Sequence, residues 1–283
     1  MQMADSARQN DGKRLLIKIL VLILALVLFG IFVWRFNLDV LKVTTVKLSD
    51  PRIKNKITLV QISDLHGKTF GKDNQRLLKK IRQQSADAIM VTGDLFSRRD
   101  RKGYEVAFNL MQALAADPTP VFYVTGEHDY NKTFHAQLTD LGVKVLAFSG
   151  ERLQIENTVL EIYGINSVYF WDSYNLANEV IADPEHYSIL LAHIPNWHRY
   201  RDAGFDLVLS GDTHGGQIRL PFVGALRLDG WFPELQQEET YIKGLYSDGS
   251  KHLYVNSGLG TVEPHFRLWN RPEITVIELT PSQ

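Results

Sequence analysis

Five short apolar runs, each followed by a turn with an acidic residue or a histidine, constrain the fold of this chain most strongly. The runs are ITLVQIS (57–63), AIMVT (88–92), VFYVT (121–125), SILLA (188–192) and DLVLS (206–210). The turns hold Asp64-Leu65-His66, Gly93-Asp94, Gly126-Glu127-His128-Asp129, His193 and Gly211-Asp212-Thr213-His214. Short apolar runs bounded by turn residues are typical of buried strands. We therefore expect carboxylates and imidazoles to gather where adjacent strands end.

Each turn has a simpler explanation when it stands alone. An Asp-x-His pair arises by chance, and Asp94 in its Gly-Asp turn suits the cap of a following helix. The recurrence of the pattern after five runs favours a shared site instead. Carboxylate and imidazole ligands suit hard or borderline divalent metals, and two such metals close together indicate hydrolysis, usually of a phosphate ester.

The N-terminal segment predicts a membrane anchor. Residues 15–34 are almost entirely Leu, Ile, Val, Phe and Ala, which is the length that a helix needs to cross a bilayer. Arg8, Lys13 and Arg14 precede it and place the N-terminus in the cytoplasm, whereas Arg35 and Lys42 follow it and weaken that assignment. A cleaved signal peptide is the alternative, but bulky residues occupy 32–35, where small residues would mark a cleavage site.

The composition excludes several classes of function. The chain has no cysteine, so disulfides, thiolate zinc sites and cysteine nucleophiles are absent. Its formal net charge is −1, with a basic N-terminal region at residues 1–56 and an acidic remainder. This distribution fits a metal enzyme better than a nucleic-acid binder, which would usually present a basic face.

The order of the apolar runs predicts an α/β fold. Amphipathic segments at 74–84, 104–115 and 133–141 alternate with the first strands, as in βαβ units. After Gly142 the runs KVLAF, LQIE and VLEIYGI suggest antiparallel hairpins, and helices are expected at 174–181 and 197–203. The expected organisation is a cytoplasmic tail at 1–14, an anchor at 15–34, a connector at 35–56 with a strand near 41–48, and a catalytic domain at 57–283.

The order of motifs DLH, GD, G-x-HD, a lone His and G-x-THGGQ resembles that of calcineurin-like metallophosphoesterases. The resemblance covers about residues 57–279 and is closest to the membrane-anchored bacterial phosphodiesterase branch, on the GGQ, LYVNSGLG and PEITVIEL segments. It implies a four-layer α/β/β/α sandwich with two metals at the strand ends. In the implied ligand set, Asp64, His66 and His214 hold the first metal, Asp94 bridges, and Glu127, His193 and Asp212 hold the second. His128 would contact the phosphate and help to protonate the leaving group, while a hydroxide bridging the metals attacks phosphorus.

The sequence departs from the family pattern at Glu127, where Asn is usual, and at Asp212, where His is usual. One interpretation is decay of the second metal site. The other is retuning, because two extra carboxylates favour harder metals. We therefore expect two divalent ions, with Mn²⁺ preferred and Mg²⁺, Fe or Zn²⁺ as alternatives, and a higher pKa for the bridging water.

The leading hypothesis from the sequence is a membrane-anchored phosphoesterase of the phosphodiesterase or pyrophosphatase type. We expect a lipid-linked or envelope substrate, no nucleic-acid partner, and a single-pass protein with its catalytic domain outside the cytoplasm. The alternative is a binding module of the same fold with an impaired second metal site. The aromatic runs at 169–171 and 231–233 suit either a substrate or membrane contact or simple packing.

Overall fold

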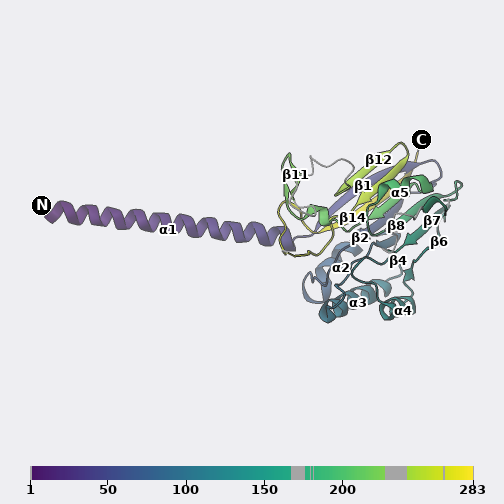
Figure 1. The fold of residues 1–283 in the computed structure, drawn as a ribbon, viewed down its shortest axis with the longest axis horizontal. Helices are drawn as coiled ribbons and strands as arrows, with labels where there is room; N and C mark the ends of the chain where they lie inside the picture. The colour runs from purple at the N-terminus through teal and green to yellow at the C-terminus, as the bar shows by residue number, and fades with distance from the viewer. Residues whose placement is uncertain are drawn as a thin grey trace.

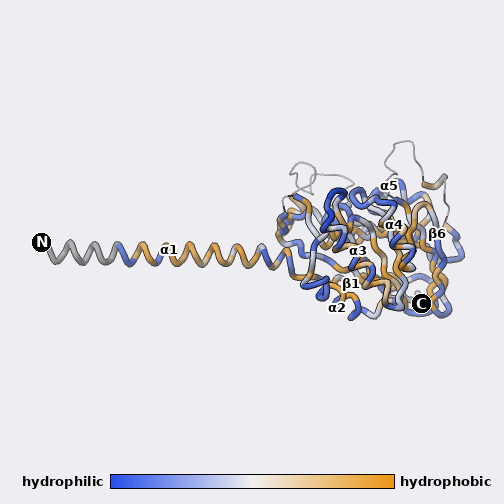
Figure 2. The backbone as a smooth tube through the Cα atoms, turned by 90° about the horizontal axis from the view of Figure 1, so that it is seen from below, coloured by the Kyte–Doolittle hydropathy of each residue, from blue (hydrophilic) through white to orange (hydrophobic). Residues whose placement is uncertain are grey.

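A long N-terminal helix, α1 (Gln2–Asp39), extends away from the rest of the molecule (Figures 1 and 2). The structure is a computed structural model that describes residues 2–166, 176–178, 180, 182–226, 241–263 and 265–282, with side chains left out for 2–12 and 178. Residues Lys13–Asp39 of α1 are long and apolar enough to cross a membrane, and the most apolar part of this span is not buried against the rest of the molecule. A signal sequence would meet the same criteria.

The first of two large sheets has six strands in the order β1-β14-β2-β3-β4-β5. Neighbouring strands are parallel except for β14 and β2, which are antiparallel. Their bounds are β1 (Lys42–Asp50), β2 (Ile57–Ile62), β3 (Ala88–Val91), β4 (Val121–Tyr123), β5 (Lys144–Val145) and β14 (Glu273–Pro281). Because β2, β3 and β4 run in the same direction, the turns that follow them lie at one edge of the sheet.

The second sheet has the order β12-β13-β9-β8-β7-β6. Its inner strands are parallel, and antiparallel pairing adds β12 and β6 at the two edges. Their bounds are β6 (Ser149–Ile155), β7 (Thr158–Ile165), β8 (Tyr187–Ala192), β9 (Leu207–Ser210), β12 (Gly244–Asp248) and β13 (Lys251–Val255). A separate antiparallel hairpin consists of β10 (Arg219–Leu220) and β11 (Gly224–Ala225).

Helices cover the outer face of each sheet and complete four layers. The first sheet carries α2 (Gln75–Arg82), α3 (Arg101–Ala115) and α4 (Lys132–Asp140), and the second carries α5 (Trp197–Tyr200). Short 3₁₀ turns lie at Lys72–Asn74, Leu176–Asn178, Arg201–Ala203 and His214–Gly216. The α/β/β/α sandwich expected from the sequence is thereby confirmed.

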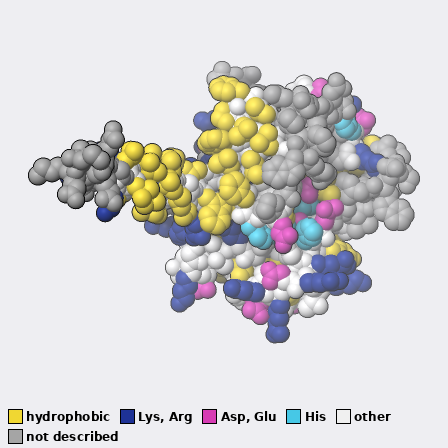
Figure 3. Space-filling view, turned by 60° about the vertical axis from the view of Figure 1, so that its left-hand side comes forward, with side chains coloured by type: hydrophobic (Ala, Val, Ile, Leu, Met, Phe, Trp, Pro, Cys, Tyr) yellow, Lys and Arg dark blue, Asp and Glu magenta, His cyan; other side chains and the backbone are white. Residues whose placement is uncertain are grey.

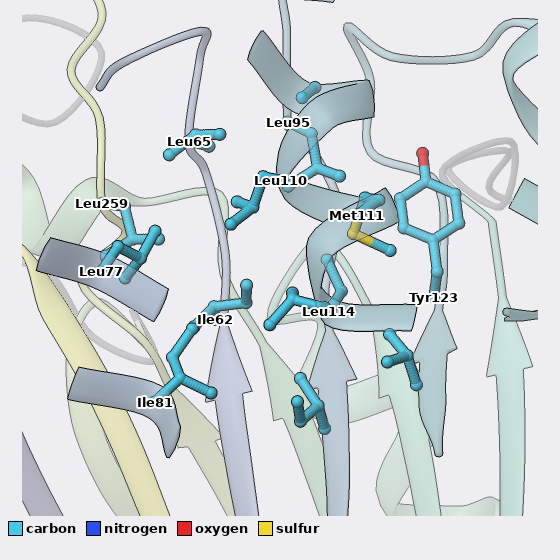
Figure 4. Close-up of a cluster of buried hydrophobic side chains, with 14 of the residues drawn as sticks. Ile62, Leu65, Leu77, Ile81, Leu95, Leu110, Met111, Leu114, Tyr123 and Leu259 are labelled. Atoms are coloured by element: carbon cyan, nitrogen blue, oxygen red, sulfur yellow. The ribbon is translucent and has the colours of Figure 1, made fainter. Parts of the chain in front are cut away.

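Three apolar clusters fill the spaces between the layers. The side chains of β2 show how one strand serves two of them: Ile57 and Leu59 pack between the sheets, whereas Val60 and Ile62 pack under the helices. Figure 4 shows the cluster under the helices, in which α3 residues such as Leu110 and Leu114 pack against the strands. Burial on both faces explains why these strands read as continuous apolar runs.

The last turn of α1 is held by the domain. Leu38 is buried, and the Lys68 ammonium donates a hydrogen bond to the Leu38 carbonyl and lies 3.6 Å from the Asp39 carboxylate. Arg271 donates to the carbonyl of Val40 at 3.0 Å. The membrane-span candidate is therefore connected to the segment that directly follows His66.

One expectation from the sequence differs from the structure. Residues 144–148 were expected in an antiparallel hairpin, but β5 pairs in parallel with β4, and the hairpin is instead formed by β6 and β7 in the other sheet. The reason is that the chain crosses between the sheets here, with Leu146 buried in the cluster between them. The helix expected at 174–181 lies partly outside the described residues, which include the 3₁₀ turn Leu176–Asn178, and the aromatic runs 169–171 and 231–233 lie entirely outside them.

Glu273 gives the fold a predictable acid sensitivity. Burial by itself raises the pKa of Glu273, but the charge of Lys243 and hydrogen bonds from Thr44 and Ser257 outweigh it and hold the pKa below its ordinary value of 4.5. A carboxyl group with a lowered folded-state pKa stabilises the protein above its unfolded pKa, and this contribution is lost as the pH falls.

We expect Glu273→Gln to lower the free energy of unfolding near neutral pH by about 1–3 kcal/mol and to weaken its dependence on pH below about 5. Urea titrations of the full chain in detergent, followed by tryptophan fluorescence, would measure both effects. Glu105→Gln, on the exposed face of α3, is the matched control. An unchanged acid dependence in Glu273→Gln would contradict the assignment.

Candidate metal centre

Turns from both sheets converge at one edge of the sandwich. Asp64 and His66 follow β2, Asp94 follows β3, and His193 and His214 follow β8 and β9. Backbone hydrogen bonds tie the turns together, from Asp64 N to Gly93 O at 2.9 Å and from Gly211 N to His193 O at 2.8 Å. Figure 3 shows histidine and acidic side chains gathered on this part of the surface.

The first group of ligand atoms comes from Asp64, His66 and His214, whose atoms lie within 4.8 Å of one another. The two imidazole Nε2 atoms are 3.1 Å apart, and His214 Nε2 is 3.7 Å from Asp64 Oδ1. Two nitrogens that face each other this closely suit a shared cation. These are the three residues that the sequence predicted for the first metal.

The second group comes from Asp64, Asp94 and His193. His193 Nε2 lies 3.4 Å from Asp94 Oδ2 and 4.0 Å from Asp64 Oδ1. Asp94 Oδ2 is also 3.6 Å from His66 Nε2, in the first group. The Asp94 carboxylate therefore stands between the two groups, where a bridging ligand would have to lie.

The hydrogen bonding of His193 tests whether these residues fit a metal. Its Nδ1 lies 2.6 Å from the Thr92 carbonyl, which accepts the ring proton, so Nε2 is the atom that carries the lone pair in the neutral ring. Nε2 is buried and faces carboxylate oxygens, the nearest of them Asp94 Oδ2 at 3.4 Å. The carboxylates require a positive charge at this point, either a proton on Nε2 or a metal ion in its place, and a ring fixed by a backbone carbonyl is the usual arrangement of a metal-binding histidine. The donor set therefore fits divalent cations.

Electrostatics divides the cluster into two kinds of group. Burial raises the pKa of Asp64 to about 7, whereas the charge of His193 outweighs burial and holds the pKa of Asp94 below its ordinary value. The carboxylates Asp94, Asp64 and Asp212 likewise outweigh burial and raise the pKa of His193 well above its ordinary value.

The first group keeps its histidines neutral. Burial lowers the pKa of His66 to about 4 and that of His214 well below its ordinary value. Both rings therefore offer lone pairs at neutral pH, which is the form that binds metal. Protons or metal ions must supply the positive charge that the two buried carboxylates require.

Most of the predicted ligands have an unusual backbone conformation. The residues Asp64, His66, Asp94, Asp212 and His214 have φ between 45° and 70°. Asp and His tolerate this left-handed region better than most residues do, and such conformations are common at functional sites. The turns thereby direct side chains from several strands toward one point.

Two glycines allow the carboxylates to lie against the backbone. A Cβ at Gly126 would stand 2.0 Å from Asp94 Oδ1, and one at Gly211 would stand 2.4 Å from Asp64 Oδ2. Any other residue at either position would displace a candidate ligand. The glycines of the third and fifth turns are therefore needed to accommodate carboxylates that belong to other turns.

The remaining predicted residues lie farther from the two groups. The Asp212 carboxylate is 31% exposed, and its Oδ1 is 3.8 Å from His193 Nε2. The Glu127 side chain is exposed and supplies no atom to either group. The His128 ring is 48% exposed, with Nε2 4.0 Å from Asp94 Oδ2, and its backbone N–H donates to Asp94 Oδ1 at 2.9 Å. The roles of all seven ligands and of His128 remain predictions.

Asp129 supports the site in a way that the sequence reasoning did not assign. It is fully buried and accepts hydrogen bonds from the N–H groups of Leu95 at 2.8 Å and Gly126 at 2.7 Å. Through these two hydrogen bonds, Asp129 holds the turn after β3 against the turn after β4. Its place directly after His128 in the third turn was the available signal.

Arg267 is a second supporting residue, and no sequence signal pointed to it. Its fully buried guanidinium donates hydrogen bonds to four backbone carbonyls, those of Ser257, Gly258, Gly260 and Asn270. The segment 256–260 in turn packs against β2 and its turn: Leu259 N donates to Ser63 O, and Gly260 N donates to Asp64 O. Arg267 thus fixes the backbone on which Asp64 rests.

Comparison with known proteins agrees with this geometry. A model of the calcineurin-like phosphoesterase family matches residues 57–216, more than half of the chain. The chain belongs to this family. It is therefore a metal-dependent phosphoric ester hydrolase, and the family uses divalent metals.

Three relatives illustrate the similarity. An uncharacterized metallophosphoesterase of Campylobacter jejuni, Cj0846, is 29% identical over 96% of this chain and 73% of its own length. An uncharacterized metallophosphoesterase of Bacillus subtilis, YkuE, is 29% identical over 78% of each protein. Phosphodiesterase YaeI of Escherichia coli is 29% identical over 70% of this chain and 72% of its own length.

The role of Asp129 leads to a test by substitution. We expect Asp129→Asn to weaken Mn²⁺ binding roughly tenfold or more, because the amide offers one acceptor oxygen for two N–H donors and loosens the turn that carries Asp94. Competition with a chelator would measure the affinity. Asp87→Asn is the control, since Asp87 also accepts from a backbone N–H, that of Thr58, but at the opposite end of β3. Equal effects of both substitutions would contradict the assigned role.

Proposed function

We propose that this protein is a membrane-anchored phosphodiesterase with a dinuclear metal centre. The observation that carries the proposal is the pair of adjacent ligand groups that share Asp64 and flank Asp94. The buried Nε2 atom of His193, which faces carboxylates, supports a cation in the second group. The family membership supports a phosphate ester as the substrate.

In this proposal Asp64, His66 and His214 hold one metal, and Asp94 bridges to the other. His193 holds the second metal with Asp212 and Glu127. Asp212 needs only a side-chain rotation, since its Oδ1 already lies 3.8 Å from His193 Nε2. Glu127 has to turn inward from its exposed position.

The metals and the protein divide the chemistry between them. Two bound divalent cations would lower the pKa of a water and neutralise charge on the phosphoryl oxygens. His128 stands at the open side of the cluster, where its ring is half exposed and its backbone is fixed by Asp94. It would contact a phosphate oxygen and donate a proton to the leaving alkoxide.

Two observations support the choice of a phosphodiester at a membrane. The relative from Escherichia coli is named a phosphodiesterase, and we transfer that activity to this chain as a proposal. The apolar helix α1 is long enough to cross a bilayer. With its N-terminus in the cytoplasm, the catalytic domain would lie outside it, near lipid-linked or envelope substrates.

The metal content and the role of His128 are tested together. We expect the full chain, reconstituted after chelation, to bind two Mn²⁺ per protomer by plasma mass spectrometry and to hydrolyse bis-p-nitrophenyl phosphate. His128→Ala should lower kcat by about 10²–10⁴-fold on a dialkyl phosphodiester, and by less on bis-p-nitrophenyl phosphate, whose nitrophenolate leaves without a proton, with two metals retained. Asp64→Asn, which alters both ligand groups, should lose metal as well as activity.

A result of one metal in the unaltered chain would overturn the dinuclear centre. Loss of a metal in His128→Ala would make His128 a ligand instead of an acid. His135→Ala is the control, because this half-buried histidine on α4 bonds to Thr125 outside the cluster.

The carboxylates Glu127 and Asp212 are expected to set the choice of metal. We expect the double variant Glu127→Asn/Asp212→His to shift preference from Mn²⁺ toward Zn²⁺, because it replaces two anionic oxygen ligands with neutral ones. Its pH–rate profile should move to lower pH. Competition dialysis against equal concentrations of both ions would measure the preference. An unchanged preference would mean that these two side chains do not contribute to the second site.

A further inference from the structure

Two large aromatic side chains are exposed in conformations that need an explanation. Phe222 is 100% exposed and Trp269 is 57% exposed. Both have left-handed backbone conformations, with φ of 66° and 49°, which bulky residues rarely adopt. The backbone therefore holds two aromatic rings outward at a cost, and a binding surface is the usual reason for such an arrangement.

These residues lie at the end of the domain from which α1 emerges. Phe222 is in the tip of the β10–β11 hairpin, and Figure 1 labels β11 near the end of α1. The hairpin is connected to the segment around Trp269 through the bridge between Ile218 and Leu268. Arg271, two residues after Trp269, donates hydrogen bonds to the carbonyls of Val40 and Leu41 and stacks over Phe36 of α1.

The surface around them is apolar with a basic margin. Figure 3 shows hydrophobic side chains gathered between α1 and the acidic and histidine side chains of the site. Pro221 at the hairpin tip is exposed, and Val223 is partly exposed. Arg35, which is 64% exposed, and the exposed Lys42 stand on either side of the point where α1 ends. Aromatic rings with flanking cations suit the zone of lipid headgroups and outer acyl chains.

We propose that the hairpin tip Pro221–Val223 and Trp269 form a membrane-contact surface that enters the interface of the bilayer in which α1 is anchored. The proposal rests on the proposed anchoring by α1. The occupant is the bilayer because this surface is continuous with the apolar helix, whose end is bonded to the same segment of chain.

The membrane-contact surface is directly connected to the metal centre. Four residues separate His214 from Arg219, the first residue of β10. Asn270, which follows Trp269, donates from Nδ2 to the His214 carbonyl at 2.7 Å. Lys68, which bonds to the end of α1, is two residues from His66. Insertion of the hairpin would therefore hold the site close to the lipid headgroups, and the substrate class that follows is a phosphodiester carried by a membrane lipid.

The absence of native cysteines allows a site-specific test. Single-cysteine variants Phe222→Cys and Leu245→Cys of the full chain would carry a spin label in vesicles of phosphatidylcholine with and without phosphatidylglycerol. Leu245 is an exposed apolar residue on β12, which Figure 1 places farther from the end of α1 than β11. We expect the label at 222 to be protected from a water-soluble nickel relaxant and accessible to oxygen, and the label at 245 to show the reverse.

The result separates the two proposals. If vesicle flotation shows no membrane association, the anchor has failed. If the protein floats but the label at 222 is as accessible to nickel as the label at 245, the membrane-contact surface is wrong while the anchor stands. Protection at both positions would indicate association between copies of the chain and would also overturn the proposal.

Activity gives a second readout. Phe222→Ser should lower the rate on hexadecyl p-nitrophenyl phosphate dissolved in the vesicles at least fivefold and leave the rate on water-soluble bis-p-nitrophenyl phosphate unchanged. Leu245→Ser should change neither rate. Equal rates of Phe222→Ser and the unaltered chain on the lipid-like diester would refute a role for the surface in substrate access.

Discussion

Two buried carboxylates, Asp64 and Asp94, stand close together between the strand ends, and the surrounding structure depends on how their charge is balanced. Carboxylates removed from water repel each other strongly and demand a compensating cation. The fold supplies the frame for this demand: parallel strands direct the turns to one edge, glycines let the oxygens touch backbone, and Arg267 holds the segment beneath Asp64. The stability of this region and its capacity to bind metal therefore depend on the same interaction, the repulsion between these two carboxylates.

The second organising feature is the direct connection between the metal centre and the end of α1. The turn that carries His66 continues to Lys68, which bonds to the Leu38 carbonyl. On the other side, the segment that bonds to His214 continues to Arg271, which bonds to Val40 and Leu41. Both contacts connect the ligands to the end of α1, the proposed membrane anchor. If α1 is the anchor, this arrangement would make the enzyme selective for substrates in the same bilayer, because the metal centre is held at a fixed distance from it.

The sequence predicted the structure well at positions where a residue type has a single physical role, such as burial in a strand. Apolar runs predicted the buried strands because β2, β3, β8 and β9 are covered on both faces, and Asp64, His66 and His214 were found together as expected. It was weaker where a role depends on long-range packing. Nothing local distinguishes Arg267 from a surface arginine, and the direction of β5 is set by its neighbour β4. The exposed position of Glu127 likewise depends on the path of a turn that no periodicity describes.

The pairing of β1 with β14 has a consequence for synthesis of the chain. The first strand after α1 lies at the edge of its sheet, and its partner there is the last strand of the chain, over nine residue pairs. β14 is synthesised only after more than two hundred further residues. By then α1, the proposed membrane anchor, has already been synthesised and is available for insertion into a bilayer. Pairing of β1 with β14 then closes a loop that contains most of the domain. The entropic cost of closing such a loop grows only slowly with its length. Until closure, β1 and β2 have open edges, which leave the nascent domain exposed to wrong strand pairing and aggregation.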